Sequence, residues 1–178
     1  MSEDNNQRKR PVDEVKAARS FYSELGQDVH YFSALWHSFN VGHMLVTDLD
    51  RICRGYDLSI ADFNLMGALR IDRPKPLRPT DLAVTLQVSN AALTSRIVRL
   101  KRKGMLITST SLSDRRAFML QLTAEGSSKV EEIHNAIARS SHFVRHFQQL
   151  PAEDQQALER IMGELHTQLD RYFVHAHR

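Results

Sequence analysis

The sequence predicts a mainly α protein with a small β-hairpin (α+β), arranged as a winged helix-turn-helix between long N- and C-terminal helices. Three observations predict it. Residues 79–103 read as a short helix, a tight turn and a second helix. Two short runs follow, one rich in Ile and Thr and one with Phe and Leu at every second position, and a basic loop joins them. Apolar residues recur at helical spacing in long stretches on both sides of this segment.

The N-terminal part is predicted to hold a tail and two helices. Residues 1–11 are polar, charged and aperiodic, so we expect a disordered tail. A first helix is predicted over 12–25, with Gly26 ending it. A long helix is predicted over 29–54, because an apolar stripe runs along it at Phe32, Leu35, Trp36, Phe39, Val46, Leu49 and Cys53.

A third helix is predicted over 59–71, ahead of the helix-turn-helix. Ser59 and Asp62 resemble a capping box at its start, with Asp in place of the usual Glu. The Arg-Pro-Lys-Pro run at 73–76 then favours an extended linker, because the residue before a proline avoids the α conformation.

The helix-turn-helix begins at Pro79, whose missing N–H suits the first helical turn. Thr80 or Asp81 can cap that helix. Ser89 ends the turn and is placed to cap the second helix, which we predict over about 90–103. The second helix has a core-facing stripe at i, i+4 and i+7, made by Leu93, Ile97 and Leu100.

The opposite face of this second helix carries small and polar side chains. Such a face can approach base edges closely in a DNA major groove, where amides and hydroxyls hydrogen-bond and small apolar groups meet thymine methyls. A solvated surface helix could carry the same residues. We expect DNA contacts from this face and from two arginines of the basic cluster that follows, giving the set Asn90, Ala91, Thr94, Ser95, Val98, Arg99 and Arg102.

The two strands are predicted over 105–111 and 117–122. Two adjacent arginines in the connecting loop suit a narrow minor groove, which concentrates negative potential. A solvated turn is the alternative, but the helix-turn-helix and the basic hairpin occur together in the order that DNA binding uses. The loop residues expected at the DNA are Asp114, Arg115 and Arg116.

Several short stretches match one known family. They are Asp81-Leu82-Ala83, Arg96-Ile97-Val98-Arg99-Leu100, Lys103-Gly104-Met105-Leu106, Asp114-Arg115-Arg116 and Leu122-Thr123 with Gly126. Through them, about residues 32–172 resemble the MarR family of winged-helix transcription regulators. The resemblance implies that Arg116 enters the minor groove, that Asp114 orients it and that Arg115 lies near phosphate.

Two more long helices are predicted after the hairpin. The first runs from Thr123 until Pro151 breaks it, with inward residues Val130, Ile133, Ile137, Val144 and Phe147. The last spans about 152–174, with an apolar stripe at Leu158, Ile161, Leu165, Leu169 and Tyr172. A small winged helix does not need so many amphipathic helices, and in the MarR family the terminal helices interlock with those of a second copy.

We therefore predict a homodimer whose chain has four parts. Two copies would prefer a pseudo-palindromic DNA site with half-sites about one helical turn apart. The parts are a tail (1–11), N-terminal dimerisation helices (12–56), a winged helix-turn-helix DNA-binding domain (57–126) and C-terminal dimerisation helices (127–178).

Composition limits the remaining functions. The 178 residues are 42% hydrophobic, enough for a compact core, and the formal charge is +3. Cys53 is the single cysteine, which excludes an intrachain disulfide, and we expect a buried structural thiol. No apolar run suits a membrane span, and the polar N-terminus does not read as a signal peptide. We expect a cytoplasmic protein without a cofactor.

Enzymatic and metal-binding functions find little support. The sequence has no nucleophile motif and no glycine-rich phosphate loop, so we do not expect an enzyme. His134, His142 and His146 would share one stripe of a continuous helix, and the last two have an i, i+4 spacing that can bind zinc. Because no carboxylates sit at matching spacing, we prefer a solvated polar face and assign no metal.

The resemblance also implies an effector site between the dimerisation helices and the winged helix. An aromatic wall with nearby cations suits an aromatic carboxylate or a phenolic compound, although Trp36 on its apolar stripe could equally be core. The second helix also looks like that of the urate-responsive branch, but that branch has Asp where Asn64 stands and Arg where Thr108 stands, which argues against urate. The candidate ligand residues are Trp36, His37, Phe63, Asn64, Arg70 and Arg96.

These observations predict a ligand-responsive transcription regulator, a repressor released from its operator by a small aromatic acid. A constitutive or architectural DNA-binding protein without an effector is the alternative. A helical protein-interaction dimer is a third class, and salt-dependent DNA binding would separate it from the first two.

Overall fold

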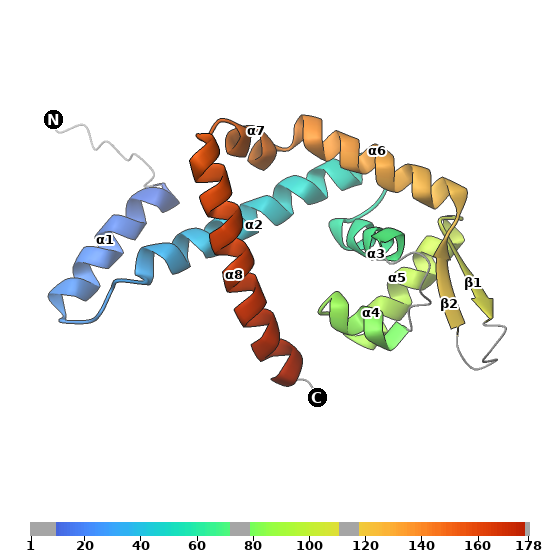
Figure 1. Cartoon of the computed structure of the whole chain (residues 1–178), viewed down its shortest axis with the longest axis horizontal. Coiled ribbons are helices and arrows are strands. Elements are labelled where there is room, and N and C mark those ends of the chain that lie inside the picture. Colours follow the sequence, from blue (N-terminus) through green and yellow to red (C-terminus); the bar gives the residue numbers. More distant parts are fainter. Residues whose placement is uncertain (1–9, 72–78, 111–117, 177–178) are drawn as a thin grey trace, which may run out of the picture. The chain divides into compact units, whose positions relative to one another are not determined.

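A computed structural model describes residues 10–71, 79–110 and 118–176 (Figure 1). These residues form eight helices and one two-stranded antiparallel sheet, which confirms the predicted mainly α fold with a small hairpin. The chain divides into two compact units between Thr47 and Asp48, inside a long helix. The four functional parts expected from the sequence stay a prediction. Among the helices described, none is long and apolar enough to cross a bilayer.

The N-terminal unit holds α1 (Pro11–Glu24) and the first part of α2 (Phe32–Arg54). Gly26 has a φ of +71°, a conformation that glycine adopts without strain, so α1 ends where the sequence predicts. The helix α2 begins three residues later than predicted. The Asp28 carboxylate accepts a hydrogen bond from the amide of His30 at 2.9 Å, which holds a turn ahead of the helix.

Aromatic rings connect the two helices of this unit. Tyr22 of α1 lies 5.7 Å from Phe32 of α2 between ring centroids, and Phe32 stacks on Trp36 at 6.1 Å. Beyond this cluster, the predicted apolar stripe of α2 is exposed in the isolated chain at Leu35 (61% of full exposure), Phe39 (71%) and Val46 (55%), whereas Cys53 at its end is buried. Trp36 is 37% exposed and so is not a core residue of the isolated chain.

The C-terminal unit has one hydrophobic core. Leu65 and Met66 of α3 are fully buried there, in one cluster with Leu82, Leu93 and Leu100. The elements that surround this core are the end of α2, α3 (Ile60–Ile71), α4 (Pro79–Thr85), α5 (Asn90–Arg102), β1 (Leu106–Thr110), β2 (Phe118–Leu122) and α6 (Ala124–Ser140). The sequence predicted a core-facing stripe on α5. That prediction is confirmed, because Leu93 and Leu100 are buried.

The hairpin joins α6 at a close backbone contact. Leu106 pairs with Leu122 at the base of the sheet. The Thr123 hydroxyl accepts a hydrogen bond from the amide of Gly126 at 2.9 Å and donates one to the carbonyl of Gly104 at 2.8 Å. A side chain at Gly126 would place its Cβ 2.2 Å from the carbonyl oxygen of Met105, so this position requires glycine. The Leu-Thr-x-x-Gly motif is thus explained by a strand end, a helix cap and a close approach.

The prediction of one helix from Thr123 to the region of Pro151 was wrong. Ser141 has an extended backbone and separates α6 from α7 (His142–Gln148). Its hydroxyl accepts from the Val144 amide at 3.3 Å and donates to the Asp48 carboxylate at 2.8 Å. The local helical pattern is therefore interrupted by a cap whose partner lies far away in the sequence. As a result, His134 lies on α6 while His142 and His146 lie on α7.

The last helix, α8 (Ala152–Ala176), follows the prediction closely. Its apolar stripe is exposed along the whole helix in the isolated chain, from Leu158 at 36% to Tyr172 at 72% of full exposure. An apolar stripe of this length that stays exposed among the described residues indicates a surface for another molecule.

Candidate nucleic-acid interface and ligand pocket

The helix α5 is held firmly at its N-terminal end. Gln87 has a φ of +51° and turns the chain between α4 and α5. Ser89 has an extended backbone, and its hydroxyl accepts a hydrogen bond from the amide of Ala92 at 3.2 Å. This is the cap that the sequence predicts. Leu93 and Leu100 then fix the buried side of the helix.

The predicted DNA-facing side of α5 is exposed. All of its small and polar residues are accessible, namely Asn90, Ala91, Thr94, Ser95 and Val98, and Arg102 continues the stripe. The Thr94 hydroxyl donates to the carbonyl of Asn90 at 2.8 Å, which leaves its oxygen available as an acceptor. The structure thus leaves this surface open, and its contact with bases stays a prediction.

Arg99 differs from the other residues of the predicted set. Its guanidinium forms an ion pair with the carboxylate of Asp62, which is only 2% exposed at the start of α3. Burial raises the pKa of Asp62, but the hydrogen bonds from Arg99 and Ser59 outweigh that effect and hold the pKa below its ordinary value. Asp62 and Ser59 also form the predicted capping box, with the Ser59 amide donating to Asp62 at 2.9 Å.

The hairpin loop with Asp114, Arg115 and Arg116 lies outside the described residues, as do the first nine residues of the expected tail and the linker at 73–76. Their roles stay predictions. The strands that lead into the loop pair in register from Leu106 with Leu122 to Thr110 with Phe118.

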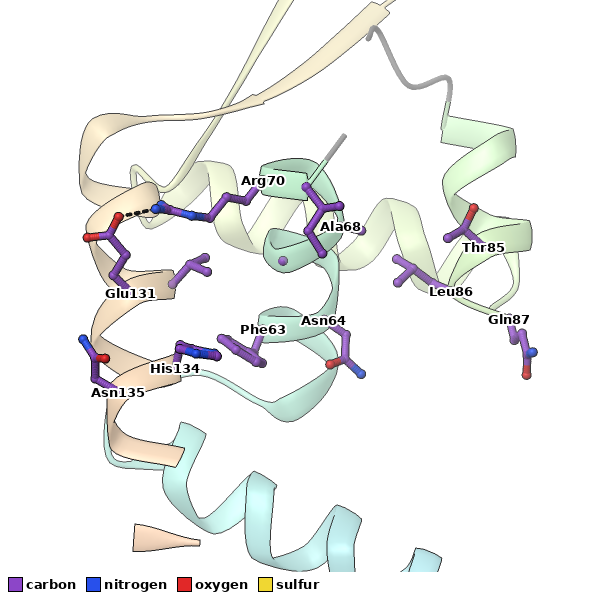
Figure 2. A pocket seen from close by; sticks show the side chains of 13 residues that line it. Phe63, Asn64, Ala68, Arg70, Thr85, Leu86, Gln87, Glu131, His134 and Asn135 are labelled. Atoms are coloured by element: carbon purple, nitrogen blue, oxygen red, sulfur yellow. Dashed lines mark hydrogen bonds and ion pairs between the residues drawn. The ribbon is translucent and has the colours of Figure 1, made fainter. Parts of the chain in front are cut away.

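A cavity of about 890 Å³ opens beside α3 (Figure 2). It is lined by α3, by the end of α4 with the following turn, and by α6. The lining residues are Phe63, Asn64, Gly67, Ala68, Arg70, Ile71, Thr85, Leu86, Gln87, Val130, Glu131, His134 and Asn135. Three of the six predicted ligand residues, Phe63, Asn64 and Arg70, therefore line one cavity.

The charge in this cavity is already paired. Arg70 is the one arginine or lysine among the described lining residues, and its guanidinium forms an ion pair with Glu131. It also donates to the carbonyl of Ser127 at 2.9 Å. A carboxylate ligand would thus compete with Glu131 for Arg70.

The remaining wall is largely aliphatic, with two rings and three side-chain amides. Figure 2 shows the rings of Phe63 on α3 and His134 on α6 turned toward each other. The side-chain amides of Asn64, Gln87 and Asn135 add hydrogen-bond donors and acceptors at the edges. Flat rings with amides at the rim suit an aromatic ligand that carries polar substituents.

Three predicted ligand residues are not among those lining the cavity. Arg96 is half-buried on α5. Trp36 and His37 lie in the N-terminal unit, and their contact with a ligand stays a prediction. Sequence reasoning also missed the residues that α6 and the turn after α4 contribute, including Gln87, Glu131 and Asn135. One signal was present, since Glu131, His134 and Asn135 form a polar group beside the inward stripe of α6.

Two further expectations concern Cys53 and the histidines. Cys53 is fully buried, and burial raises the pKa of its thiol to about 11, with the carboxylates of Asp50 and Asp62 adding to the effect. The thiol is therefore structural, because a reactive cysteine needs a lowered pKa and exposure. Within the ranges that the structure describes, no three histidine, cysteine or acidic residues are grouped as a metal site.

Comparison with known proteins gives one sequence relative and many structural ones. No protein-family model matches the chain. The HTH-type transcriptional regulator PecS of Dickeya dadantii (strain 3937) is 33% identical over 86 residues, which are 48% of this chain and 52% of PecS. The chain thus matches about half the length of this relative.

Solved structures match over most of the chain at low identity. The S. aureus MepR–DNA complex has a TM-score of 0.66 and 17% identity, with 79% of this chain and 99% of MepR covered. AbsC of Streptomyces coelicolor, a MarR family transcriptional regulator, has a TM-score of 0.66 and 20% identity, with 80% and 97% covered. CouR of Rhodococcus jostii RHA1 bound to p-coumaroyl-CoA has a TM-score of 0.64 and 15% identity, with 74% and 88% covered.

These likenesses confirm the resemblance that the sequence motifs predict. The capped helix-turn-helix, the short hairpin and the long flanking helices occur together in the described residues, and AbsC, a MarR family regulator, matches 80% of the chain at a TM-score of 0.66. The chain therefore has the winged helix-turn-helix fold of the MarR family of transcription regulators.

Proposed function

We propose that the chain is a transcription regulator of the MarR type that binds DNA through α5. The observation that carries the proposal is the exposed stripe of small polar residues on a helix that is capped at Ser89 and buried on its other side. Such a helix can enter a major groove without rearranging. The proposal is supported by the relatives, since PecS is named as a transcriptional regulator and MepR and CouR have been solved on DNA.

The acting form in this proposal is a homodimer. The apolar stripe of α8 and the part of the α2 stripe between Leu35 and Val46 are exposed in the isolated chain, and Phe39, Ile161 and Leu165 are among their residues. Self-association through two amphipathic helices of each copy would remove this surface from water. Two copies would then present two α5 helices to a pseudo-palindromic operator.

The cavity beside α3 is proposed to hold a small aromatic effector that releases the operator. Phe63 and His134 supply ring surfaces and Arg70 supplies a cation. The CouR structure with p-coumaroyl-CoA shows that a protein of this fold binds a ligand with an aromatic group. An effector releases DNA if it binds better to a conformation whose two α5 helices no longer match the half-site spacing. A coupling of about 1–3 kcal/mol is enough for such control.

The test is fluorescence anisotropy with a labelled duplex taken from the DNA upstream of the coding sequence. Salt-dependent binding of the full chain supports a DNA-binding regulator, and its absence contradicts one. Asn90→Ala and Thr94→Ala are expected to relax the choice of base without large loss of non-specific affinity. Gln156→Ala, on the exposed side of α8 away from the apolar stripe, is the matched control.

Effector control is tested on the same complex. Aromatic carboxylates, phenolic compounds, urate and zinc chloride are titrated into it. Release by an aromatic compound, abolished by Phe63→Ala, supports the cavity as the effector site. Tight binding that no compound of the panel relieves contradicts the aromatic effector and favours a constitutive or architectural DNA-binding protein.

A further inference from the structure

The two arginines near the end of α5 have different surroundings. Arg102 follows Val98 by four residues and so continues the exposed stripe. It makes no hydrogen bond or ion pair within the described parts of the chain. Arg99 lies at the edge of the stripe, and its guanidinium is paired with Asp62 at the start of α3.

The Asp62 carboxylate depends on Arg99 for its counter-charge. Its Oδ2 atom accepts hydrogen bonds from the Ser59 amide at 2.9 Å and from the Ser59 hydroxyl at 2.7 Å. Its Oδ1 atom accepts from Arg99. Among the described residues, Arg99 is the one cation that forms an ion pair with it.

Moving Arg99 onto a DNA phosphate would leave this buried carboxylate with its two hydrogen bonds from Ser59 but without a counter-charge. The pKa of Asp62 lies below its ordinary value despite burial, so the group is charged at neutral pH. A buried carboxylate that loses its counter-charge is destabilised, because the desolvation of the charge is no longer offset by an ion pair. A new contact with phosphate would have to offset that cost, whereas Arg102 can bind phosphate without breaking an ion pair.

A second ion pair connects the end of α5 to the turn before α3, and it is weaker. Lys103 pairs with Asp57, but the Asp57 side chain is 95% exposed, so solvent screens the interaction. The Asp62–Arg99 pair is therefore the ionic contact that fixes the end of α5 against α3.

We propose that Arg99 is a positioning residue, which seats α5 on α3 through Asp62, and that Arg102 makes the phosphate contact. The inference rests on the proposed function of α5 in DNA binding. It gives different roles to Arg99 and Arg102, which the sequence pattern places together in one basic cluster. Arg99 then acts on DNA affinity through the orientation of α5.

Arg99→Gln and Arg102→Gln form a matched pair, since each removes one positive charge from the same helix. Affinity for the labelled upstream duplex is measured by anisotropy between about 50 and 200 mM KCl, and log K is plotted against log salt. Arg102→Gln is expected to lower the salt slope by about one for each protomer, because fewer counterions are released. Arg99→Gln is expected to lower affinity about tenfold with the wild-type slope.

Asp62→Asn gives the second readout. Arg99 keeps its charge in this variant but loses its partner. The proposal expects Asp62→Asn to weaken DNA binding as Arg99→Gln does, and the double variant to bind no more weakly than either single one. A direct phosphate contact by Arg99 predicts instead that Asp62→Asn binds DNA as well as the wild type or better.

The results distinguish a positioning role of Arg99 from a direct phosphate contact. A lowered salt slope in Arg99→Gln, or an unchanged affinity in that variant, overturns the proposal. Far-UV circular dichroism of each variant checks the fold, and if Asp62→Asn does not fold, the slopes of Arg99→Gln and Arg102→Gln still decide. A wild-type chain without salt-dependent DNA binding contradicts the proposed function and this inference together, whereas a wild-type chain that binds with a lowered slope in Arg99→Gln contradicts this inference alone.

Discussion

The carboxylate of Asp48, at the end of α2, accepts a hydrogen bond from the hydroxyl of Ser141 at 2.8 Å across 93 positions of sequence. The same carboxylate oxygen accepts from the amide of His142 at 2.7 Å, so Asp48 caps α7 from another helix. Arg51 completes the contact, since it pairs with Asp48 and donates to the carbonyl of Ser140 at 3.0 Å. The junction of α6 and α7 is thereby attached to the end of α2.

Removal of this cap is expected to destabilise the C-terminal unit. Asp48→Asn takes the charge from a nearly buried carboxylate that has several donors, and we expect the free energy of unfolding to fall by about 2 kcal/mol. Ser141→Ala should cost about 1 kcal/mol, as a lost N-cap does. Urea denaturation at fixed protein concentration measures both. Glu132→Gln, which breaks an exposed pair with Lys129, is the control and should change little. A midpoint for Asp48→Asn equal to that of the control would contradict the assignment.

Acid should remove the stabilisation that the Asp48 carboxylate gives to the folded chain. Burial raises the pKa of Asp48, but the hydrogen bonds from Arg51, Ser141 and the amides of His142 and Phe143 lower it to about 2. Because the folded pKa lies below the unfolded value, the stabilisation is complete above about pH 4 and is lost as the pH falls toward 2. The shift corresponds to about 2 kcal/mol. Urea midpoints from pH 6 to pH 2 should therefore converge for the wild type and Asp48→Asn, and a constant gap would contradict this.

Local signals in the sequence predicted most of the fold. The caps at Ser89 and at Ser59 with Asp62 were predicted and are confirmed, because a cap depends on residues within three positions of each other. The burial of Leu93 and Leu100 was predicted for the same reason, since helical spacing fixes which side chains share a face.

Contacts between distant segments escaped prediction. The helix break at Ser141 depends on a hydrogen bond to Asp48, and no residue near Ser141 in the sequence indicates that partner. The cavity combines Phe63 of α3 with Gln87 and Glu131, which come from separate elements and meet only in the folded chain. The pairing of Arg70 with Glu131 likewise changes the electrostatics that the sequence suggested for the ligand site.

Gly126 is expected to tolerate no side chain. A Cβ there would lie 2.2 Å from the Met105 carbonyl oxygen and 3.3 Å from Leu122, so the first turn of α6 would have to move away from the strand. We expect Gly126→Ala to lower the free energy of unfolding by about 2–4 kcal/mol. Gly67→Ala on α3, with nothing within 4 Å of its new Cβ, should be neutral or stabilise by up to about 1 kcal/mol. Equal melting temperatures of the two variants would count against this close approach.

Glu131→Gln is expected to make the regulator more sensitive to aromatic carboxylates. The substitution removes the charge that competes for Arg70, so a carboxylate ligand gains an unopposed ion pair. Half-release of the DNA complex by benzoate, salicylate or p-coumarate should then need about tenfold less ligand, which is about 1.4 kcal/mol. Glu132→Gln, at the neighbouring position and outside the cavity lining, should respond as the wild type does. A lower sensitivity in Glu131→Gln would mean that Glu131 itself binds the ligand.

A charge on the stripe of α8 is expected to dissociate the proposed dimer. Leu165 is 50% exposed in the isolated chain and lies at the middle of the stripe, so association would bury it. Leu165→Asp would place a carboxylate in that apolar surface, and we expect the dissociation constant to rise by about a hundredfold or more. Gln156→Asp adds the same charge to the same helix away from the stripe and should leave the dimer intact. Sedimentation at micromolar concentration measures both, and a wild-type monomer, or a Leu165→Asp dimer, would show that α8 is not the interface.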